Sequence, residues 1–258
     1  MNNQLYLAWL DLETGGLNGR LDNGKLGMEH YPIFEVAMIV TDAELNQVGL
    51  PLHIVIHQTE ERIAECSEWA IETHTKSGLL AQVRESTITL EQAESMIMER
   101  LKSLGIEKYD RKAKTGAILA GNSIMFDRSY IMCQMPTLND YLHYRQLDVS
   151  AFNLAVRMLQ PEIEERVVKE YKHEALADIR ESIAEYAVYI DALFGIKDIE
   201  RFDYLSSLSE KLNAAHGTNY SWRVDINHNR VCLDDMGTDG HDIRKAIDIS
   251  MMRTSSDD

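Results

Sequence analysis

Apolar residues along the first part of the chain form continuous runs of the length that buried strands have. Such runs occupy residues 5–11, 33–41 and 52–57 and predict three strands. The turn-forming stretch DAELN, at 42–46, separates the second strand from the third. We therefore expect a meander of three strands at the start of the fold.

Further along the chain, helical spacing of apolar residues alternates with short buried runs. Helices are predicted over 60–71 and 90–104, from about 126, and over 151–159 and 176–194, the last two ended by Pro161 and Gly195. The runs at 116–123 and 144–150 predict two more strands. Strands followed by alternating strands and helices indicate an α/β domain over residues 1–195, with a mixed five-stranded sheet.

Residues 196–258 follow a different pattern. A helical pattern at 199–216 precedes the runs YSWRVDI and RVCLDD, which flank the turn residues NHN, and a helix is predicted over 242–252. We expect a small α+β appendage of helix, hairpin and helix. Its residues do not decide whether it docks on the first domain, extends a dimer interface or contacts a partner. A calcium loop is excluded there, because Arg230 and Met236 stand where such a loop needs Gly and Glu.

Composition narrows the classes of function. Hydrophobic residues make up 45% and charged residues 26% of the 258, as in ordinary globular proteins, and neither a membrane-spanning run nor a secretory signal is expected. The three cysteines lie far apart, which argues against disulfides and cysteine-bound zinc and favours a reducing cytoplasm. A net charge of -16 disfavours duplex nucleic acid, so a phosphate-bearing substrate must be held locally, through metal ions.

Two carboxylates stand at the end of the first strand, in the stretch LAWLDLETGGL. Side chains alternate along a strand, so Asp11 and Glu13 emerge on the same side, about 7 Å apart. Like charges so placed repel unless a cation lies between them, and Mg²⁺ favours oxygen ligands. The alternative is that Glu13 belongs to a solvated turn with Gly15 and Gly16.

Two later stretches supply further candidate groups. In GNSIMFDR, a buried strand ends at Gly121 and Asp127 begins the next helix, where it could also serve as a helix cap. In HEALADIRES, His173 precedes Asp178 by five residues, although a single histidine is commonly structural or exposed. Four acids and one histidine at strand and helix ends describe a site for two metal ions that promote phosphoryl displacement.

At these residues the chain resembles the DEDDh three-prime to five-prime exonucleases, and among them the oligoribonuclease family. The resemblance covers most of residues 5–195 and includes WLDLE, EWAIETHTKSGL, GNSI, HYRQLDVS and HEALADIRESIAE. It implies a ribonuclease-H-like fold with helices on both faces of the sheet. It also implies that two divalent ions, Mg²⁺ or Mn²⁺, are held by Asp11, Glu13, Asp127 and Asp178, and that His173 is the general base.

The same resemblance implies how the substrate is bound. Leu17 and Trp69 match residues that hold the two bases of a short strand. The residues that match a terminal phosphate site are Ser123, His143, Tyr144 and Arg145, the last three donated across a homodimer interface. His74 matches a family position beside the site. Two alternatives stay open: Trp69 could pack in the core, and residues 143–145 could be a simple polar loop.

Three features depart from the family pattern. Thr14 and Gly15 stand where oligoribonuclease has Met and Thr, and Met125 and Phe126 replace Gly and Gln; both differences are typical of proofreading exonucleases. The segment 18–31 is longer than the family loop by several residues and lies beside the expected nucleotide pocket.

These features leave three hypotheses. The first is a metal-dependent exoribonuclease that degrades short oligoribonucleotides, including dinucleotides, to nucleoside five-prime monophosphates. The second is a proofreading-type exonuclease for longer single-stranded DNA or RNA. The third is a non-catalytic module that sequesters a nucleotide, which the intact set of acids and His173 disfavours.

Overall fold

The structure is a computed structural model that describes residues 5–167, 175–194, 220–225, 230–235 and 245–248. The chain divides into two compact units, Met1–Leu193 and Phe194–Asp258. Within the described residues, no helix has both the length and the apolar character that crossing a membrane requires.

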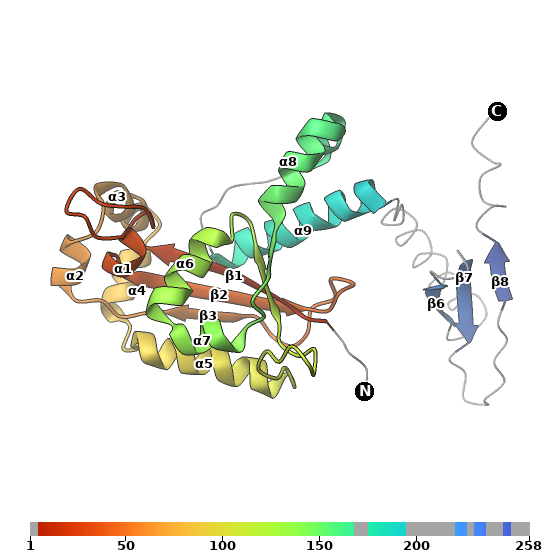
Figure 1. The fold of residues 1–258 in the computed structure, drawn as a ribbon, viewed down its shortest axis with the longest axis horizontal. Coiled ribbons are helices and arrows are strands. Elements are labelled where there is room, and N and C mark those ends of the chain that lie inside the picture. Colours follow the sequence, from red (N-terminus) through yellow and green to blue (C-terminus); the bar gives the residue numbers. More distant parts are fainter. Residues whose placement is uncertain (1–4, 168–174, 195–219, 226–229, 236–244, 249–258) are drawn as a thin grey trace. The chain divides into compact units, whose positions relative to one another are not determined.

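The first unit is built on a mixed five-stranded sheet (Figure 1). Its strands are β1 (Leu7–Thr14), β2 (Ile33–Thr41), β3 (Leu52–Val55), β4 (Ile118–Gly121) and β5 (Gln146–Asp148), in the order β3-β2-β1-β4-β5. The strands β1, β2 and β3 pair antiparallel, and β4 and β5 continue the sheet parallel to β1. The predicted α/β class, the meander and the mixed sheet are confirmed.

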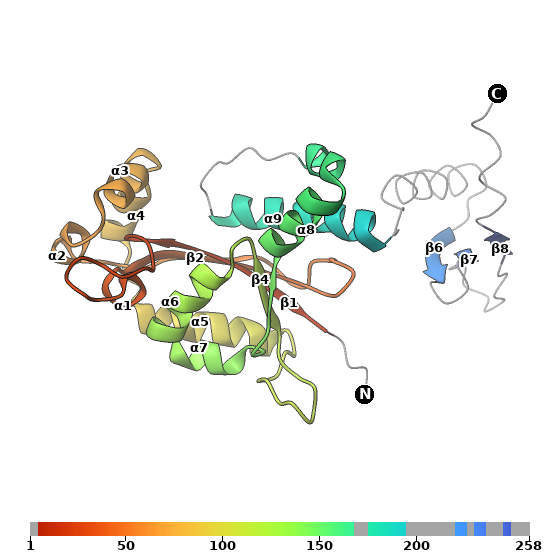
Figure 2. The same cartoon turned by 45° about the horizontal axis from the view of Figure 1, so that its top comes forward.

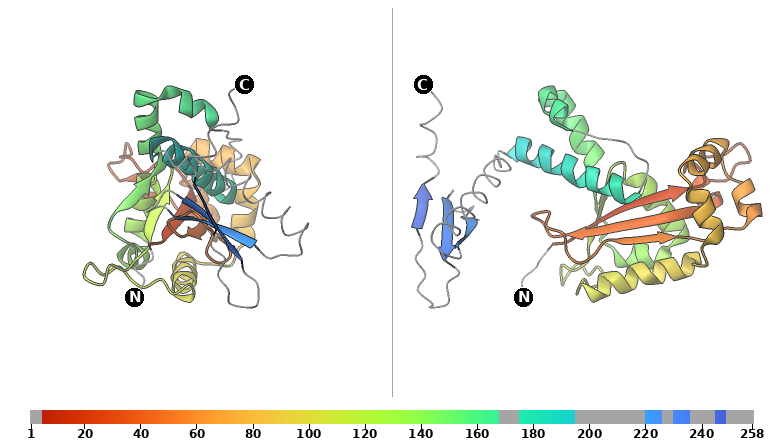
Figure 3. Two further views of the ribbon diagram at one scale, coloured as in Figure 1. Left: turned by 90° about the vertical axis from the view of Figure 1, so that its right-hand side faces the viewer. Right: turned by 180° about the vertical axis from the view of Figure 1, so that it is seen from behind.

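Helices cover both faces of this sheet (Figures 2 and 3). On one face lie α5 (Leu90–Ser103), α6 (Met125–Gln134) and α7 (Pro136–Tyr141), and on the other α8 (Val149–Leu159), the 3-10 helix η1 (Pro161–Arg166) and α9 (Ala175–Phe194). The remaining helices are α1 (Gly27–His30), α2 (Glu60–Ala64), α3 (Glu68–Lys76) and α4 (Leu79–Glu85).

The alternation of side chains along β1 decides which face receives the acids. Ala8, Leu10 and Leu12 pack into the core that contains α5, α6 and α7. Leu7 and Trp9 pack into the second core, against α8 and α9. Because side chains of a strand alternate, Asp11 and Glu13 continue the row of Leu7 and Trp9 toward the face that carries α9.

The predicted helix over 60–71 is instead two short helices. Thr59 caps α2 by accepting a hydrogen bond from Arg62 N, and Ser67 caps α3 by accepting one from Ala70 N. Serine and threonine hydroxyls satisfy the first backbone amides of a helix, so Ser67 starts a new helix inside an apolar pattern that looks continuous. The turn places Trp69 and His74 on a helix of their own, α3.

The second unit contains an antiparallel three-stranded sheet of β6 (Tyr220–Asp225), β7 (Arg230–Asp235) and β8 (Lys245–Asp248). The predicted hairpin is confirmed by the pairing of β6 with β7. The prediction of a helix over 242–252 is wrong for residues 245–248, because Lys245–Asp248 is a strand paired with β7. Cross-strand pairing there overrides the helical spacing of apolar residues. The helix predicted over 199–216 lies outside the described residues.

Candidate active site

Three carboxylates converge where β1 meets the start of α9. Asp11 and Glu13 come from the end of β1, and Asp178 comes from the first turn of α9. Each offers an oxygen atom, and these oxygens all lie within 4.8 Å of one another. The alternative of Glu13 as a residue of a solvated turn fails, because Glu13 is inside β1, opposite Glu35 of β2. An all-oxygen group of this kind fits a hard divalent cation such as Mg²⁺ or Mn²⁺.

The electrostatics of these acids also favour a cation. Burial, together with the charges of Glu35, Asp178 and Asp127, raises the pKa of Glu13 to about 8. Burial and the neighbouring carboxylates, Asp127 first among them, hold the pKa of Asp11 well above its ordinary value. Protons therefore neutralise part of the cluster when no metal is bound, and a divalent ion would replace them.

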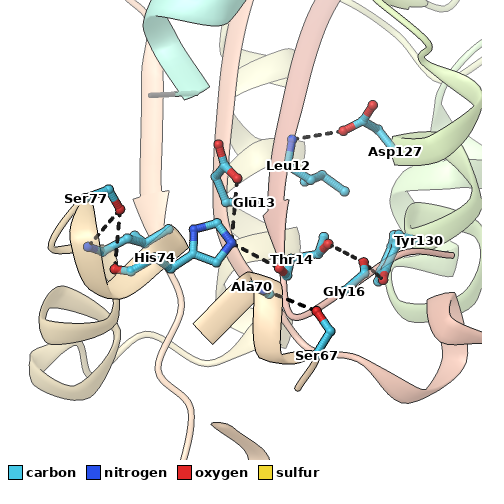
Figure 4. Close-up of polar contacts among 11 residues, drawn as sticks. Leu12, Glu13, Thr14, Gly16, Ser67, Ala70, His74, Ser77, Asp127 and Tyr130 are labelled. Carbon is cyan, nitrogen blue, oxygen red and sulfur yellow. Dashed lines mark hydrogen bonds and ion pairs between the residues drawn. The ribbon is translucent and has the colours of Figure 1, made fainter. Parts of the chain in front are cut away.

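Asp127 approaches the same strand from α6. Its Oδ1 accepts a hydrogen bond from the backbone N–H of Leu12 at 2.9 Å, between the two acids of β1 (Figure 4). The side chain is buried, and burial raises the pKa of Asp127 to about 7 against the lowering effect of its backbone hydrogen bonds. Asp127 is thus more than a surface helix cap, and its charge raises the pKa of Asp11. Asp127 does not belong to the group of three acids whose oxygens all lie within 4.8 Å of one another.

His74 links the acids to the outer part of the site. The imidazole is buried on α3 and points toward the end of β1 (Figure 4). Its Nε2 lies 3.1 Å from the carbonyl oxygen of Thr14 and 3.8 Å from Glu13 Oε2. A carbonyl oxygen only accepts, so Nε2 carries the hydrogen and donates it. The ring also meets the ring of Trp69 edge-on, at 6.5 Å between centroids.

Leu17 and Trp69 line one cavity. They are 72% and 61% exposed, so the alternative of Trp69 as a core residue does not hold. The cavity has a volume of about 570 Å³. Its lining residues are Leu17, Gly19, Arg20, Leu21, Tyr31, Ser67 and Trp69.

The residues matched to a phosphate site form two separate groups. Ser123 follows β4 in a left-handed conformation, with φ of 49°, and its N–H donates to Asp148 Oδ1 and Ser150 Oγ. His143 and Tyr144 stack at 4.7 Å between ring centroids, and Arg145 lies over the Tyr144 ring at 5.4 Å. This second group is an exposed aromatic and cationic cluster, since Tyr144 is 58% exposed.

One predicted residue, His173, is not among the described residues, and one residue near the acids, Glu35, was not predicted. His173 lies outside the described residues, so its role as general base stays a prediction. Glu35 was not foreseen: it is 8% exposed, contacts His53 Nε2 and raises the pKa of Glu13. The signal that could have identified it is a charged residue in the middle of the apolar run IFEVAMIVT.

The family is settled by comparison with known proteins. The model of the exonuclease family named RNase T matches residues 8–186. The chain belongs to this exonuclease family. The same stretch of sequence holds the three converging carboxylates and the cavity of Leu17 and Trp69.

Curated relatives of this exonuclease include oligoribonucleases. The oligoribonuclease of Vibrio parahaemolyticus is 40% identical over 190 residues, which are 74% of this chain and 96% of the relative. That of Escherichia coli K12 is 38% identical over 187 residues, 72% of this chain and 94% of the relative. The resemblance to oligoribonuclease is confirmed, and with it the enzyme class of a three-prime to five-prime exonuclease, a phosphodiester hydrolase.

Solved structures agree on the fold. Exonuclease I from Methylocaldum szegediense matches this exonuclease with a TM-score of 0.54 and 18% identity, over 89% of this chain and 50% of that one. Exonuclease I of Escherichia coli, solved with a dA16 oligonucleotide, matches with a TM-score of 0.52 and 18% identity. The match covers 90% of this chain and 55% of that one. The chain thus spans about half the length of these structures. They support the ribonuclease-H-like arrangement of sheet and helices.

Proposed function

We propose that this exonuclease degrades short oligoribonucleotides, dinucleotides included, to nucleoside five-prime monophosphates with the help of two Mg²⁺ or Mn²⁺ ions. The observation that carries the proposal is the convergence of Asp11, Glu13 and Asp178 within 4.8 Å. Next to it, His74 contacts both the end of β1 and Trp69 of the base cavity. The identity to oligoribonucleases supports the choice of a short substrate.

Four side chains would hold the ions. The oxygens of Asp11, Glu13 and Asp178 lie close together, and Asp127 would be the fourth ligand, from α6. When bound, two divalent ions lower the pKa of a water molecule and stabilise the charge on the leaving oxygen. The acids therefore have to release protons before they act as ligands. Their raised pKa values make binding stronger as pH rises.

His173 would act as general base. In this proposal an unprotonated ring nitrogen of His173 accepts the proton of the attacking water, so the imidazole has to be neutral. Activity should then rise with pH through the pKa of this histidine. A rate that is flat from acid to neutral pH would contradict the assignment.

The substrate would be held at both ends. Leu17 and Trp69 contact the bases, since exposed aromatic rings stack on bases of any sequence. Ser123 and the cluster of His143, Tyr144 and Arg145 bind the terminal phosphate. The cluster is donated by the second subunit of a homodimer, and its exposure in one chain supports this arrangement.

A dimer is supported by a second feature of the surface. On α8, Leu154, Met158 and Leu159 are 58%, 77% and 72% exposed. Exposed large apolar side chains on one helix are suited to an interface with another copy of the chain.

We assign residues 1–195 to the catalytic domain and 196–258 to an appendage, and we expect the enzyme to work in the cytoplasm.

One observation favours the second hypothesis, a nuclease for longer single strands. The fold resembles exonuclease I, which has been solved with a dA16 oligonucleotide, and Thr14, Gly15, Met125 and Phe126 follow the proofreading pattern. Comparing the turnover of a dinucleotide with that of a long strand separates the two. A preference for the long strand would exclude the first proposal.

The test of the whole proposal is product analysis of a labelled RNA ladder, first with Mg²⁺ and then with a chelator. Shortening from the three-prime end to five-prime monophosphates, abolished by the chelator, is the expected result. Asp11→Ala should abolish hydrolysis while the fold is kept. Unchanged turnover of that variant would exclude metal catalysis at this site, and tight nucleotide binding without any hydrolysis would support the non-catalytic module.

A further inference from the structure

The cavity of Leu17 and Trp69 has an additional wall that the family resemblance does not supply. Gly19, Arg20, Leu21 and Tyr31 line it, and all four belong to the segment 18–31. With Leu17 and Trp69 they enclose about 570 Å³. Pockets of roughly 300–1,000 Å³ hold small organic ligands.

Hydrogen bonds inside the segment give this wall a defined shape. Leu21 N donates to Lys25 O at 2.8 Å, and Gly24 N donates to Leu21 O at 2.9 Å. Gly24 has a φ of 85°, which a glycine adopts without strain, and its carbonyl accepts a hydrogen bond from Arg20 Nη1 at 3.0 Å. The tight turn therefore fixes Arg20 and Leu21 at the cavity.

The turn is also tied to the domain behind it. Gly27 N donates to Gly19 O at 2.7 Å, and a Cβ atom at Gly27 would lie 1.7 Å from the carbonyl oxygen of Leu17, so only glycine fits there. From α6, Gln134 Nε2 donates to the carbonyl oxygens of Met28 and Tyr31, both at 2.8 Å. The wall is thus preformed.

From this geometry we infer that Arg20 and Leu21 determine specificity by enclosing the base that lies against Trp69, and that they favour a purine there. The inference rests on the proposed role of the cavity in base binding. Leu21 adds apolar surface, and the guanidinium of Arg20 can stack on a base face. A two-ring base covers more of these surfaces than a one-ring base and gains more from them.

The inference is tested with Arg20→Ala and Leu21→Ala, with Lys25→Ala as the matched control from the same turn. Lys25 is exposed and does not line the cavity. Steady-state constants are measured for a diadenosine and a dicytidine dinucleotide with Mg²⁺. For the purine substrate we expect the KM of both cavity variants to rise about tenfold, or about 1.4 kcal/mol, with kcat unchanged. For the pyrimidine substrate the change is smaller, and Lys25→Ala behaves as the unaltered enzyme.

Binding of adenosine five-prime monophosphate, measured by calorimetry with Mg²⁺ on the same proteins, makes the result independent of hydrolysis. If the enzyme hydrolyses no dinucleotide but the cavity variants lose nucleotide affinity, the proposed function fails and the inference holds. If it hydrolyses dinucleotides and neither KM nor affinity responds to either substitution, the inference is overturned and the function stands. Arg20→Ala keeps the test valid if Leu21→Ala fails to fold, because Arg20 is exposed.

Discussion

Asp127 Oδ1 accepts a hydrogen bond from the backbone N–H of Leu12 at 2.9 Å, which joins α6 to the strand that carries Asp11 and Glu13. One carboxyl group therefore has a structural task, the anchoring of β1, and in the proposed function a second task as a metal ligand. These two tasks can be separated by substitution.

Asp127→Asn keeps an oxygen that can accept from Leu12 N–H but removes the charge. We expect kcat to fall about a hundredfold or more, because the proposed metal site loses one ligand, while the unfolding temperature in chelator stays at or above that of the original. Asp127→Ala loses the hydrogen bond as well and should cost about 1–3 kcal/mol of stability. Urea unfolding and turnover measured on both variants check this; equal stability of the two would refute the anchoring role.

Stability without metal should fall as pH rises. The pKa of Glu13 is raised from 4.5 to about 8, so between these values the folded protein holds a proton that the unfolded chain has released. Because the folded state binds more protons, its stability decreases with pH over this window. Saturating Mg²⁺ should cancel the decrease by replacing the protons.

The measurement is the unfolding temperature between pH 5 and 8, with chelator and with Mg²⁺. Glu13→Gln serves as the control, since it cannot titrate and should lose part of the slope. Identical profiles with and without Mg²⁺ would show that the acids bind no metal.

His74 is expected to act by position rather than by touching the substrate. Its Nε2 donates to Thr14 O and lies 3.8 Å from Glu13 Oε2. His74→Ala should lower kcat about tenfold, by releasing the end of β1 that carries Glu13. We also expect His74→Ala to weaken Mn²⁺ binding. His74→Gln can keep an N–H donor for Thr14 O, so it should restore part of kcat and part of the Mn²⁺ affinity. If both variants have the kcat and Mn²⁺ affinity of the original enzyme, His74 is structural only.

Trp69 should matter for binding and not for folding, because its side chain is 61% exposed. Trp69→Ala is expected to weaken dinucleotide binding by about 1–3 kcal/mol, and Trp69→Phe by less, since a phenyl ring still stacks. Substrate titrations and thermal unfolding measure the two effects. A large loss of stability with unchanged KM would return Trp69 to a packing role.

If the enzyme is the proposed homodimer, two inactive variants should complement each other. Asp11→Ala lacks an intact acid cluster, and Arg145→Ala lacks the phosphate contact that the proposal places across the dimer interface. In a mixed dimer, one site combines the acids of the second variant with Arg145 of the first. Mixing the two, with subunit exchange followed by native mass spectrometry, should therefore restore activity. No recovery in verified mixed dimers would contradict donation across the interface.

The parts of the fold that the sequence predicts well are those set by local pattern. The run IFEVAMIVT, buried at every position, predicts β2 with its observed ends, Ile33–Thr41. Strand alternation likewise predicts that Asp11 and Glu13 share a face. The break at Ser67 and the strand Lys245–Asp248 were missed, because a hydroxyl cap and cross-strand pairing override apolar spacing there.

The site depends on contacts between residues far apart in sequence, and spacing alone does not encode these. Asp178 was grouped with the other acids because it lies near a helix start in the same domain, and the family resemblance then implied its role as a metal ligand; no periodicity links it to β1. Glu35 was missed because its effect on Glu13 arises only when β2 pairs with β1 in the observed register. The wall of Arg20 and Leu21 follows from hydrogen bonds of the turn and of α6, which no motif describes.

The most direct test of the account is to measure bound Mn²⁺ and turnover in the same samples. Mn²⁺ is titrated into the chelated enzyme, bound ions are counted by electron paramagnetic resonance, and dinucleotide hydrolysis is assayed at each point. We expect two ions per chain, turnover that rises as they bind, and loss of both in Asp11→Ala. Full turnover with no Mn²⁺ bound, or unaltered binding and turnover in Asp11→Ala, would contradict it.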